Sequence, residues 1–199
     1  MAEHVLPGET VSGDRYTVQP VPDGALIAVV DGLGHGAEAA TAAEVATATL
    51  QAHSHEPVIS LLERCHLALK HTRGAAISLA SFNGVCGSMT WVGVGNVEGV
   101  ILRAVDKTAA TPEHIPLFSG VAGYRLPPLR ALVTPVNRGD VVIFYTDGIR
   151  GDVVFEPAYR ASPELIAHRI CDKYCKATDD ALVFVARYLG LASTAVRSR

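Results

Sequence analysis

The sequence predicts an α+β fold, a β-sandwich with helices packed outside it. Runs rich in β-branched and aromatic residues outnumber the segments with helical spacing. Short turn signals separate most neighbouring runs, so these runs can pair as antiparallel strands. Helical segments occur in only two parts of the chain, at 37–71 and at 162–176. Helices in these places can cover the sheets and complete a layered domain.

The first part of the chain is expected to hold one hairpin and two helices. Residues 11–30 contain an alternating run, the turn sequence P-V-P-D-G at 20–24 and an apolar return strand. Residues 37–52 are rich in alanine, which favours a helix. Apolar residues at helical spacing predict a second helix over 58–71.

The remainder is expected to consist mostly of strands. The runs 75–82, 88–94 and 97–105 are separated by the turn signals N-G and G-N, and they predict an antiparallel meander. A connection rich in Pro and Gly follows. Ser162 and Pro163 predict the start of a helix that runs to about residue 176. Further strands are expected at 131–135, 140–145 and 181–189.

Composition indicates one globular domain over 1–190, followed by a disordered tail at 191–199. Of the 199 residues, 49% are hydrophobic and 19% are charged. The net charge is −3 and no basic stripe is present, which argues against a nucleic-acid partner. No apolar run reaches membrane-spanning length and no secretory leader pattern precedes the domain, so we expect a cytoplasmic monomer without a membrane partner. The four cysteines lack zinc-site spacing and are expected to be buried free thiols.

Two apolar runs end on the same dipeptide. Residues 25–30 lead into Asp31-Gly32, and residues 141–146 lead into Asp147-Gly148. A carboxylate at the mouth of a buried strand is costly unless it is paired, hydrogen-bonded or bound to a metal. The following glycine lets the backbone turn sharply or approach a ligand. The repeated pattern therefore indicates a shared acidic site.

Two further aspartates stand at the edges of expected strands. Asp14 precedes the first strand, and the pair Asp179-Asp180 precedes the last. Four carboxylates without a nearby His or Cys form an all-oxygen ligand set, which Mg²⁺ and Mn²⁺ prefer. Two such ions can hold phosphoryl oxygens for in-line attack. Each aspartate alone also fits an ordinary turn residue, and the sequence leaves open whether Asp179 or Asp180 would bind metal.

Four short motifs carry these residues in a fixed order. They are S-G-D at 12–14, D-G-L-G-H-G at 31–36, T-D-G-I at 146–149 and D-D at 179–180. They resemble the S/C-G-D, D-G-[ML]-G-x-G, T-D-G-[IVL] and D-D-x-T motifs of metal-dependent serine/threonine phosphatases of the PPM class, in the SpoIIE-like branch. Order and spacing match over essentially the whole chain. The resemblance is strongest to small stand-alone members that reset the stressosome.

The resemblance implies a four-layer αββα sandwich, in which helices flank two antiparallel sheets. It implies a phosphoserine/phosphothreonine protein phosphatase that uses two divalent cations, Mn²⁺ or Mg²⁺. Asp31 would bridge both ions, Asp14 and the Gly32 carbonyl would complete the shell of one, and Asp147 and Asp179 would hold the other. A hydroxide bound by both metals would attack phosphorus directly, with Asp31 and Asp147 as catalytic residues. The implied partners are phosphorylated STAS-domain proteins of a stressosome.

Two positions depart from the family pattern. The threonine of D-D-x-T is absent, since Ala181-Leu182-Val183 follows the two aspartates. Leu33 stands where many larger members have a histidine that is proposed as the general acid. His35 is a candidate substitute near the substrate, although an exposed turn histidine fits equally. Arg73 is a candidate phosphate ligand because a guanidinium suits bidentate recognition, although an arginine at a helix C-terminus is also favoured by the helix dipole.

Two alternatives compete with this interpretation. The loop G-L-G-H-G at 32–36 between a strand and a helix suggests a dinucleotide site, but its spacing differs from G-x-G-x-x-G and Asp31 would repel a pyrophosphate. The second alternative is a catalytically degenerate phosphatase fold that binds a phosphoprotein. The missing threonine favours it, and the four aspartates oppose it.

Overall fold

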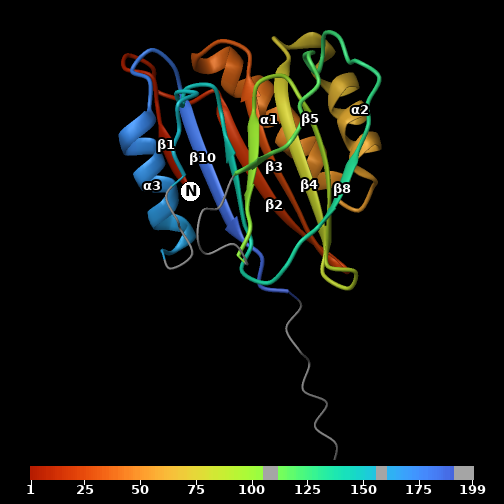
Figure 1. Cartoon of the computed structure of the whole chain (residues 1–199). Coiled ribbons are helices and arrows are strands. Elements are labelled where there is room, and N and C mark those ends of the chain that lie inside the picture. The colour runs from red at the N-terminus through yellow and green to blue at the C-terminus, as the bar shows by residue number, and fades with distance from the viewer. Residues whose placement is uncertain (105–111, 156–160, 191–199) are drawn as a thin grey trace, which may run out of the picture.

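Two five-stranded antiparallel sheets stack face to face at the centre of the molecule (Figure 1). The computed structural model describes residues 1–104, 112–155 and 161–190. Sheet A has the order β1 (Ala2–His4), β10 (Ala181–Arg187), β9 (Val141–Tyr145), β6 (Glu98–Leu102) and β7 (Glu113–His114). Sheet B has the order β2 (Asp14–Val21), β3 (Gly24–Gly32), β4 (Ala75–Asn83), β5 (Ser88–Val94) and β8 (Leu132–Pro135).

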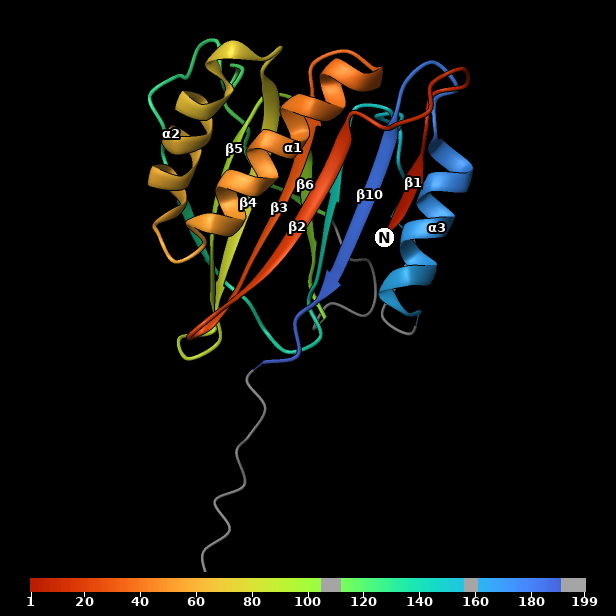
Figure 2. The ribbon, with the colours of Figure 1, turned by 180° about the vertical axis from the view of Figure 1, so that it is seen from behind.

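Helices cover the outer face of each sheet (Figures 1 and 2). Helix α1 (Gly36–Ala52), helix α2 (Val58–Ala68) and the short 3₁₀ helix η1 (Leu69–His71) lie on sheet B, and helix α3 (Pro163–Tyr174) lies on sheet A. Three apolar clusters fill the spaces between these layers, one under α1 and α2, one between the sheets and one under α3. The predicted four-layer αββα sandwich is therefore confirmed.

Strand β3 shows why its sequence is an unbroken apolar run. Leu26, Ala28 and Val30 belong to the cluster under α1 and α2. Ile27 and Val29 belong to the cluster between the sheets. Because successive side chains of a strand point to opposite faces, a strand buried on both faces must be apolar at every position.

The helices begin and pack as their sequences predict. In α1, the buried alanines Ala39, Ala42 and Ala43 allow the helix to approach sheet B closely. In α3, the Ser162 side chain accepts a hydrogen bond from the Leu165 N–H at 3.2 Å, and Pro163 occupies the first turn. The N-cap expected from Ser162 and Pro163 is therefore present.

The predicted meander is wrong at its third strand. Strand β6 does not pair with β5; it crosses to sheet A and pairs with β9 and β7. The free edge of β5 is occupied by β8, whose Leu132 pairs with Trp91. While the Trp91 backbone pairs within sheet B, its ring packs across the sandwich onto Gly99 of β6, where a Cβ atom would lie 2.2 Å from the ring. The absence of a side chain at Gly99 therefore leaves room for the Trp91 ring between the two sheets.

A second turn also transfers the chain between the sheets. Strands β8 and β9 flank Asn137-Arg138-Gly139, yet β8 belongs to sheet B and β9 to sheet A. Gly139 has a φ of +99°, and the Asp140 N–H donates to the Asn137 carbonyl at 2.9 Å. The local turn chemistry is the expected one, but it does not close a hairpin.

Several smaller elements were not expected from the sequence. Strands β1 and β7 span three and two residues, too few for a periodic pattern.

The expectation that the cysteines are buried is confirmed only in part. Cys65 and Cys171 are buried and Cys175 is half-buried, but Cys86 is exposed, so the expectation is wrong there. The predicted tail at 191–199 lies outside the described residues. Within the described residues, no helix combines the length and the apolar character that a membrane crossing requires.

Candidate metal centre

Asp14 and Asp31 lie directly opposite each other on two paired strands of sheet B. Asp14 begins β2, Asp31 stands next to the end of β3, and the antiparallel register pairs the two residues. Directly opposed residues in such a pair have Cβ atoms about 5 Å apart. Asp14 is only 3% exposed. The fold therefore brings together two carboxylates that are 17 positions apart in the sequence.

Asp147 and Asp179 belong to the corresponding end of sheet A. Asp147 follows β9, and Asp179 stands just before β10, which pairs with β9. A hydrogen bond joins this end to sheet B, since the buried Thr146 hydroxyl donates to Asp14 Oδ2 at 2.7 Å. The same hydroxyl accepts from the Leu182 N–H at 2.9 Å. The predicted acidic residues therefore lie around one seam between the sheets.

Each of the two D-G glycines allows another segment to approach closely. A Cβ atom at Gly32 would lie 2.1 Å from the Ala39 carbonyl oxygen of α1. A Cβ atom at Gly148 would lie 1.9 Å from the Asp180 carbonyl oxygen. Neither glycine has a positive φ. Glycine is thus required at both positions by close backbone packing rather than by a left-handed turn.

Burial and mutual repulsion oppose ionisation of the sheet B carboxylates. Burial, and then the neighbouring carboxylates of Asp14, Asp147, Asp179 and Asp180, raise the pKa of Asp31 to about 9. Burial is also the main cause that raises the pKa of Asp14 to about 7, although the Thr146 hydroxyl opposes it. Burial raises the pKa of Asp179 as well. Repulsion among these groups shows that the carboxylates lie close together.

The donor set suits a hard cation, but the side chains are not arranged as a ligand shell. In the described part of the chain, no three His, Cys, Asp or Glu side chains form a group that could hold one ion. Asp14 accepts a hydrogen bond from Thr146, Asp147 from the Asn96 amide at 2.7 Å, and Asp179 from the Asp180 N–H at 2.9 Å. The oxygen chemistry and the repulsion fit divalent cations, and the assignment of individual ligands stays a prediction.

His35 and Arg73 lie beside the loop that follows Asp31. The His35 ring is exposed and close enough to Asp179 for its charge to lower the pKa of that carboxyl in part. Its Nδ1 contacts Glu9 Oε1 at 2.6 Å. Arg73 forms an ion pair with Glu38 of α1. Its guanidinium lies against Gly34, where a Cβ atom would meet Arg73 Nη1 at 2.6 Å.

Four residues of this region were missed by the sequence analysis. They are Glu9, which contacts His35; Asn96, which holds Asp147; Thr146, which joins the sheets; and Lys176, whose Nζ donates to the Asp147 carbonyl oxygen. Three of these contacts join segments more than 25 positions apart, and that of Thr146 spans 132. No local pattern could have revealed them, apart from the T of T-D-G-I.

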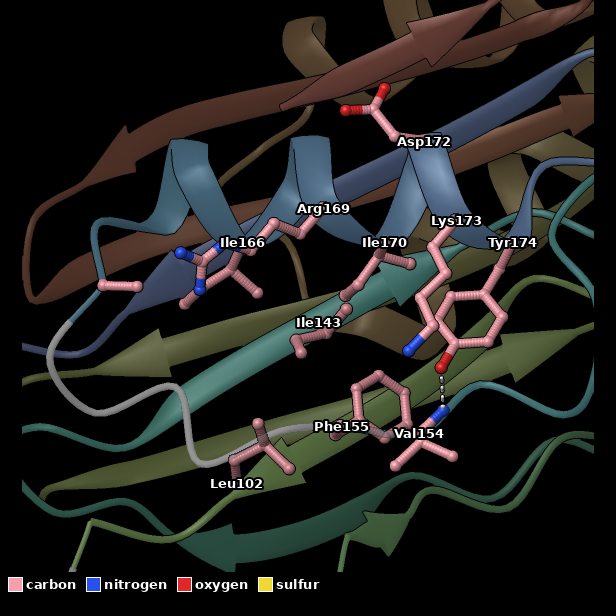
Figure 3. A pocket seen from close by; sticks show the side chains of 11 residues that line it. Leu102, Ile143, Val154, Phe155, Ile166, Arg169, Ile170, Asp172, Lys173 and Tyr174 are labelled. Carbon is pink, nitrogen blue, oxygen red and sulfur yellow. Dashed lines mark hydrogen bonds between the residues drawn. The ribbon is translucent and has the colours of Figure 1, made fainter.

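Two cavities differ in their relation to the carboxylates. One of about 380 Å³ lies between α3 and sheet A, with Leu102, Ile143 and Ile170 among its lining residues, and none of the predicted ligands borders it (Figure 3). Another of about 290 Å³ borders Asp147 and is lined also by Asn96, His114 and Lys176. Of these two cavities, the second is placed to receive part of a substrate whose reacting group lies at the acidic site.

The dinucleotide alternative is wrong. Strand β3 leads into the glycine loop and α1, but both of its neighbours, β2 and β4, are antiparallel to it. A dinucleotide-binding unit requires parallel strands joined by the crossover helix. The glycines at 32–36 instead accommodate α1, Arg73 and Glu9.

The fold is that of PPM-type phosphatases. The family model described as "Stage II sporulation protein E (SpoIIE)" matches residues 22–189. The chain therefore belongs to the SpoIIE family, and its predicted class, a protein serine/threonine phosphatase, is confirmed at the level of this family.

One curated protein and two solved structures show which relatives this chain resembles. The curated phosphoserine phosphatase RsbX of Bacillus subtilis (strain 168) is 28% identical over 142 residues, which cover 71% of this chain and 69% of that protein. A solved structure from work on the bacterial stressosome as a modular system adapted to control secondary messenger signalling is 31% identical, with a TM-score of 0.86 over 94% of this chain and 96% of that one. RsbX in complex with magnesium superposes with a TM-score of 0.80 at 22% identity, over 92% and 91% of the two chains, and confirms the fold.

Proposed function

We propose that the protein is a phosphoserine/phosphothreonine protein phosphatase that depends on two divalent cations, Mn²⁺ or Mg²⁺. The observation that carries this proposal is the buried, directly opposed pair Asp14 and Asp31. A divalent cation between these carboxylates would favour their charged form and offset their repulsion. The proposed ligands are Asp14, Asp31, the Gly32 carbonyl, Asp147 and Asp179. Binding of magnesium by the structural neighbour RsbX supports a divalent cation.

The proposed ligands divide unequally between two ions. Asp31 would serve both, Asp147 and Asp179 would complete the firmer site, and Asp14 with the Gly32 carbonyl would complete the weaker one. When bound, such a pair of cations activates a water molecule and neutralises charge on phosphoryl oxygens. With so few protein ligands, water fills most of the remaining octahedral positions.

The remaining chemistry falls to His35 and Arg73. When the serine Oγ–P bond breaks, the departing oxygen needs a proton, and His35 Nε2 is the proposed donor. The contact of Nδ1 with Glu9 supports this role because the carboxylate orients the ring. Nε2 can give up a proton only from the imidazolium, in which both ring nitrogens are protonated, and the donor would be left as neutral imidazole. Arg73 is proposed to bind phosphate oxygens across the loop beside Gly34.

The proposal for Arg73 is tested by Arg73→Lys. Lysine keeps the charge but loses the bidentate fork. We expect KM for a phosphoserine peptide to rise about tenfold with little change in kcat, because phosphate binding is worth about 1–3 kcal/mol for a charged hydrogen bond. Arg138→Lys in the exposed turn at the other end of β9 is the control. An unchanged KM would assign Arg73 to the ion pair with Glu38 alone.

The central experiment measures phosphate release from a phosphoserine peptide with Mn²⁺ or Mg²⁺, and again after addition of a chelator. We expect turnover that requires the cation and is lost with the chelator. Binding of the peptide without turnover would instead support the degenerate phosphoprotein-binding module.

The proposed substrates are phosphorylated STAS-domain proteins of a stressosome-type signalling complex, which the enzyme would reset, acting as a cytoplasmic monomer. The similarity to RsbX and to a structure from stressosome work supports this choice. Incubation with phosphorylated candidate scaffolds, followed by measurement of phosphate loss at each site, tests it. Equal release from unrelated phosphoproteins would contradict a dedicated substrate.

A further inference from the structure

One buried carboxylate holds both ends of the loop that precedes Asp14. This N-terminal loop, residues 5–13, connects β1 to β2. Asp180 Oδ1 accepts the Leu6 N–H at 2.8 Å, and Asp180 Oδ2 accepts the Gly13 N–H at 2.7 Å. Asp180 is only 3% exposed. In both views of the ribbon the red N-terminal loop runs beside the blue segment that enters β10 (Figures 1 and 2).

The middle of the N-terminal loop reaches the glycine loop after Asp31. Glu9 Oε1 contacts His35 Nδ1 at 2.6 Å. A Cβ atom at Gly36 would lie 2.6 Å from Glu9 Oε2, so glycine leaves the space that this carboxylate occupies. The Glu9 N–H donates to the Leu6 carbonyl at 3.0 Å, which folds the loop into a turn. The loop thus touches His35 and then leads directly into Asp14.

Asp180 also packs against the sheet A half of the site. A Cβ atom at Gly148, the residue after Asp147, would lie 1.9 Å from the Asp180 carbonyl oxygen. The Asp180 backbone therefore contacts the Asp147-Gly148 turn, while its carboxylate holds the segment that carries Asp14. Asp180 therefore adds a second connection between the two halves of the site, beside the hydrogen bond from Thr146 to Asp14.

The two adjacent aspartates consequently have different tasks. Both oxygens of the buried Asp180 are engaged by backbone N–H groups. Asp179 is half-buried, and from the described residues its carboxylate accepts one hydrogen bond, from the Asp180 N–H to Oδ1, which leaves Oδ2 without a partner among them. A side chain with unengaged oxygen at the site is suited to a metal, whereas one saturated by amides is suited to holding the backbone.

We propose that Asp180 is a positioning residue that fastens the N-terminal loop, and with it Asp14 and Glu9, to the Asp147 turn. This inference rests on the proposed function only for its consequence for metal binding. The attachment of the loop is a property of the chain itself. Asp179, rather than Asp180, is then the ligand, which resolves the choice that the sequence leaves open.

The test compares two neighbouring acid-to-amide variants, Asp180→Asn and Asp179→Asn. Asparagine keeps the size of Asp180 but turns one acceptor into a donor, so one loop N–H loses its partner. Hydrogen exchange of the 5–13 segment is measured in chelator, and Mn²⁺ binding is measured by calorimetry. Thermal unfolding checks that each variant is folded.

For Asp180→Asn we expect exchange of the 5–13 segment to accelerate at least about tenfold, with the weaker Mn²⁺ step weakened about tenfold and the firmer step unchanged, since loss of a supporting partner typically costs 10–100-fold in metal affinity. For Asp179→Asn we expect normal exchange and loss of the firmer step. Should Asp180→Asn fail to fold, Glu9→Gln replaces it, with faster exchange in the loop and a lower kcat expected because His35 loses its partner.

Three results would overturn the inference. One is unchanged exchange in Asp180→Asn, or in Glu9→Gln where it takes its place. Another is accelerated exchange in Asp180→Asn with both Mn²⁺ steps intact, which would reduce Asp180 to a purely structural role. The third is loss of the firmer step in Asp180→Asn rather than in Asp179→Asn. A wild-type protein that binds no Mn²⁺ would refute the proposed function instead, and the exchange data would still decide the attachment of the loop.

Discussion

The two halves of the acidic site are built from the same sequence pattern but are stabilised differently. In sheet B, Asp14 and Asp31 face each other in register, and the Asp31 carboxylate accepts no hydrogen bond from the described part of the chain. In sheet A, Asp147 is exposed, its carboxylate is held by Asn96 and its carbonyl by Lys176. The sheet B half therefore brings two carboxylates together, whereas the sheet A half orients Asp147 by hydrogen bonds.

This difference teaches that a shared motif does not imply a shared energetic role. Burial and repulsion in the sheet B half oppose ionisation, and a bound cation would favour the charged form of its carboxylates. In the sheet A half, Asp147 is exposed and its carboxylate accepts a hydrogen bond from Asn96. Substitutions in the two halves should then differ both in size and in kind.

Asp31→Asn should have the largest effect, a loss of about 100-fold or more in kcat/KM, because it removes the charge that both cations would share. In the metal-free protein the same change should leave the fold intact, since it removes a repelled carboxylate. Phosphate release from a phosphopeptide with Mn²⁺ measures the first effect, and urea unfolding in chelator the second. Asp23→Asn, in the turn between β2 and β3 at the opposite end of sheet B, is the matched control. Near-normal activity of Asp31→Asn would refute the dimetal assignment.

The metal-free protein should become less stable as the pH rises. The pKa values of Asp14 and Asp31, about 7 and about 9, exceed the ordinary value of 3.8. Each group therefore takes up a proton on folding, and its contribution to the free energy of unfolding is complete below about pH 4 and is lost as the pH passes through about 7 and then about 9.

Urea unfolding in chelator at about pH 5, 7 and 9 measures this loss. Asp31→Asn should flatten the upper part of the dependence, and added Mn²⁺ should stabilise the protein more at high pH than at low pH. A free energy of unfolding that rises between pH 5 and 9 would contradict the charge distribution of the sheet B half.

Asp14→Ala should affect metal binding more than stability. In the proposed site the weaker cation would rely on Asp14, so the Mn²⁺ concentration for half-maximal activity should rise about tenfold. The stability of the metal-free protein should change less, because relief of repulsion offsets the lost hydrogen bond from Thr146. Calorimetric titration checks the result. Two unaltered binding steps would make Asp14 an ordinary turn residue.

Thr146→Val should weaken the connection between the halves by about 1–3 kcal/mol of unfolding free energy, because Asp14 Oδ2 and the Leu182 N–H both lose a buried partner. Thr146→Ser keeps the hydroxyl and is the control. Chemical denaturation in chelator compares the variants, and equal midpoints for valine and serine would show that the bond contributes nothing.

Asn96→Ala should have the smallest effect. Its hydrogen bond to Asp147 is exposed to water, so we expect only a twofold to fivefold rise, corresponding to about 0.5–1 kcal/mol, in the Mn²⁺ concentration for half-maximal activity. Titration of activity with Mn²⁺ measures it. An effect as large as that of Asp14→Ala would mean that the two halves are equally dependent on their partners.

The sequence predicted local elements well and their partners less well. The apolar run of β3, the alanine helix α1 and the Ser162 cap each depend on neighbouring residues, and all were confirmed. The turns at Gly95 and at Asn137–Gly139 have the chemistry of hairpin turns, and nothing local distinguishes a hairpin from a crossing between sheets. That choice depends on the packing of Trp91 over Gly99 and on the occupation of the β5 edge by β8.

Some residues of the candidate site were likewise predictable from local sequence, and others were not. Asp31 and Asp147 were found because each follows a buried strand, and the register then placed Asp14 opposite Asp31. Glu9, Asn96 and Asp180 act through contacts with distant segments, the last across 167 and 174 positions. Their roles follow only from the folded chain.

The hydrogen bond from Thr146 to Asp14 crosses from one sheet to the other, and this has a consequence for assembly of the molecule. A chain in which only one sheet has formed possesses half of the ligands and no complete binding site. Occupancy by a divalent cation would thus report that the two sheets have docked in the correct register. By mass action, the cation would favour that docked state over any misaligned competitor. The proposed metal site would in this way also stabilise the correctly docked fold.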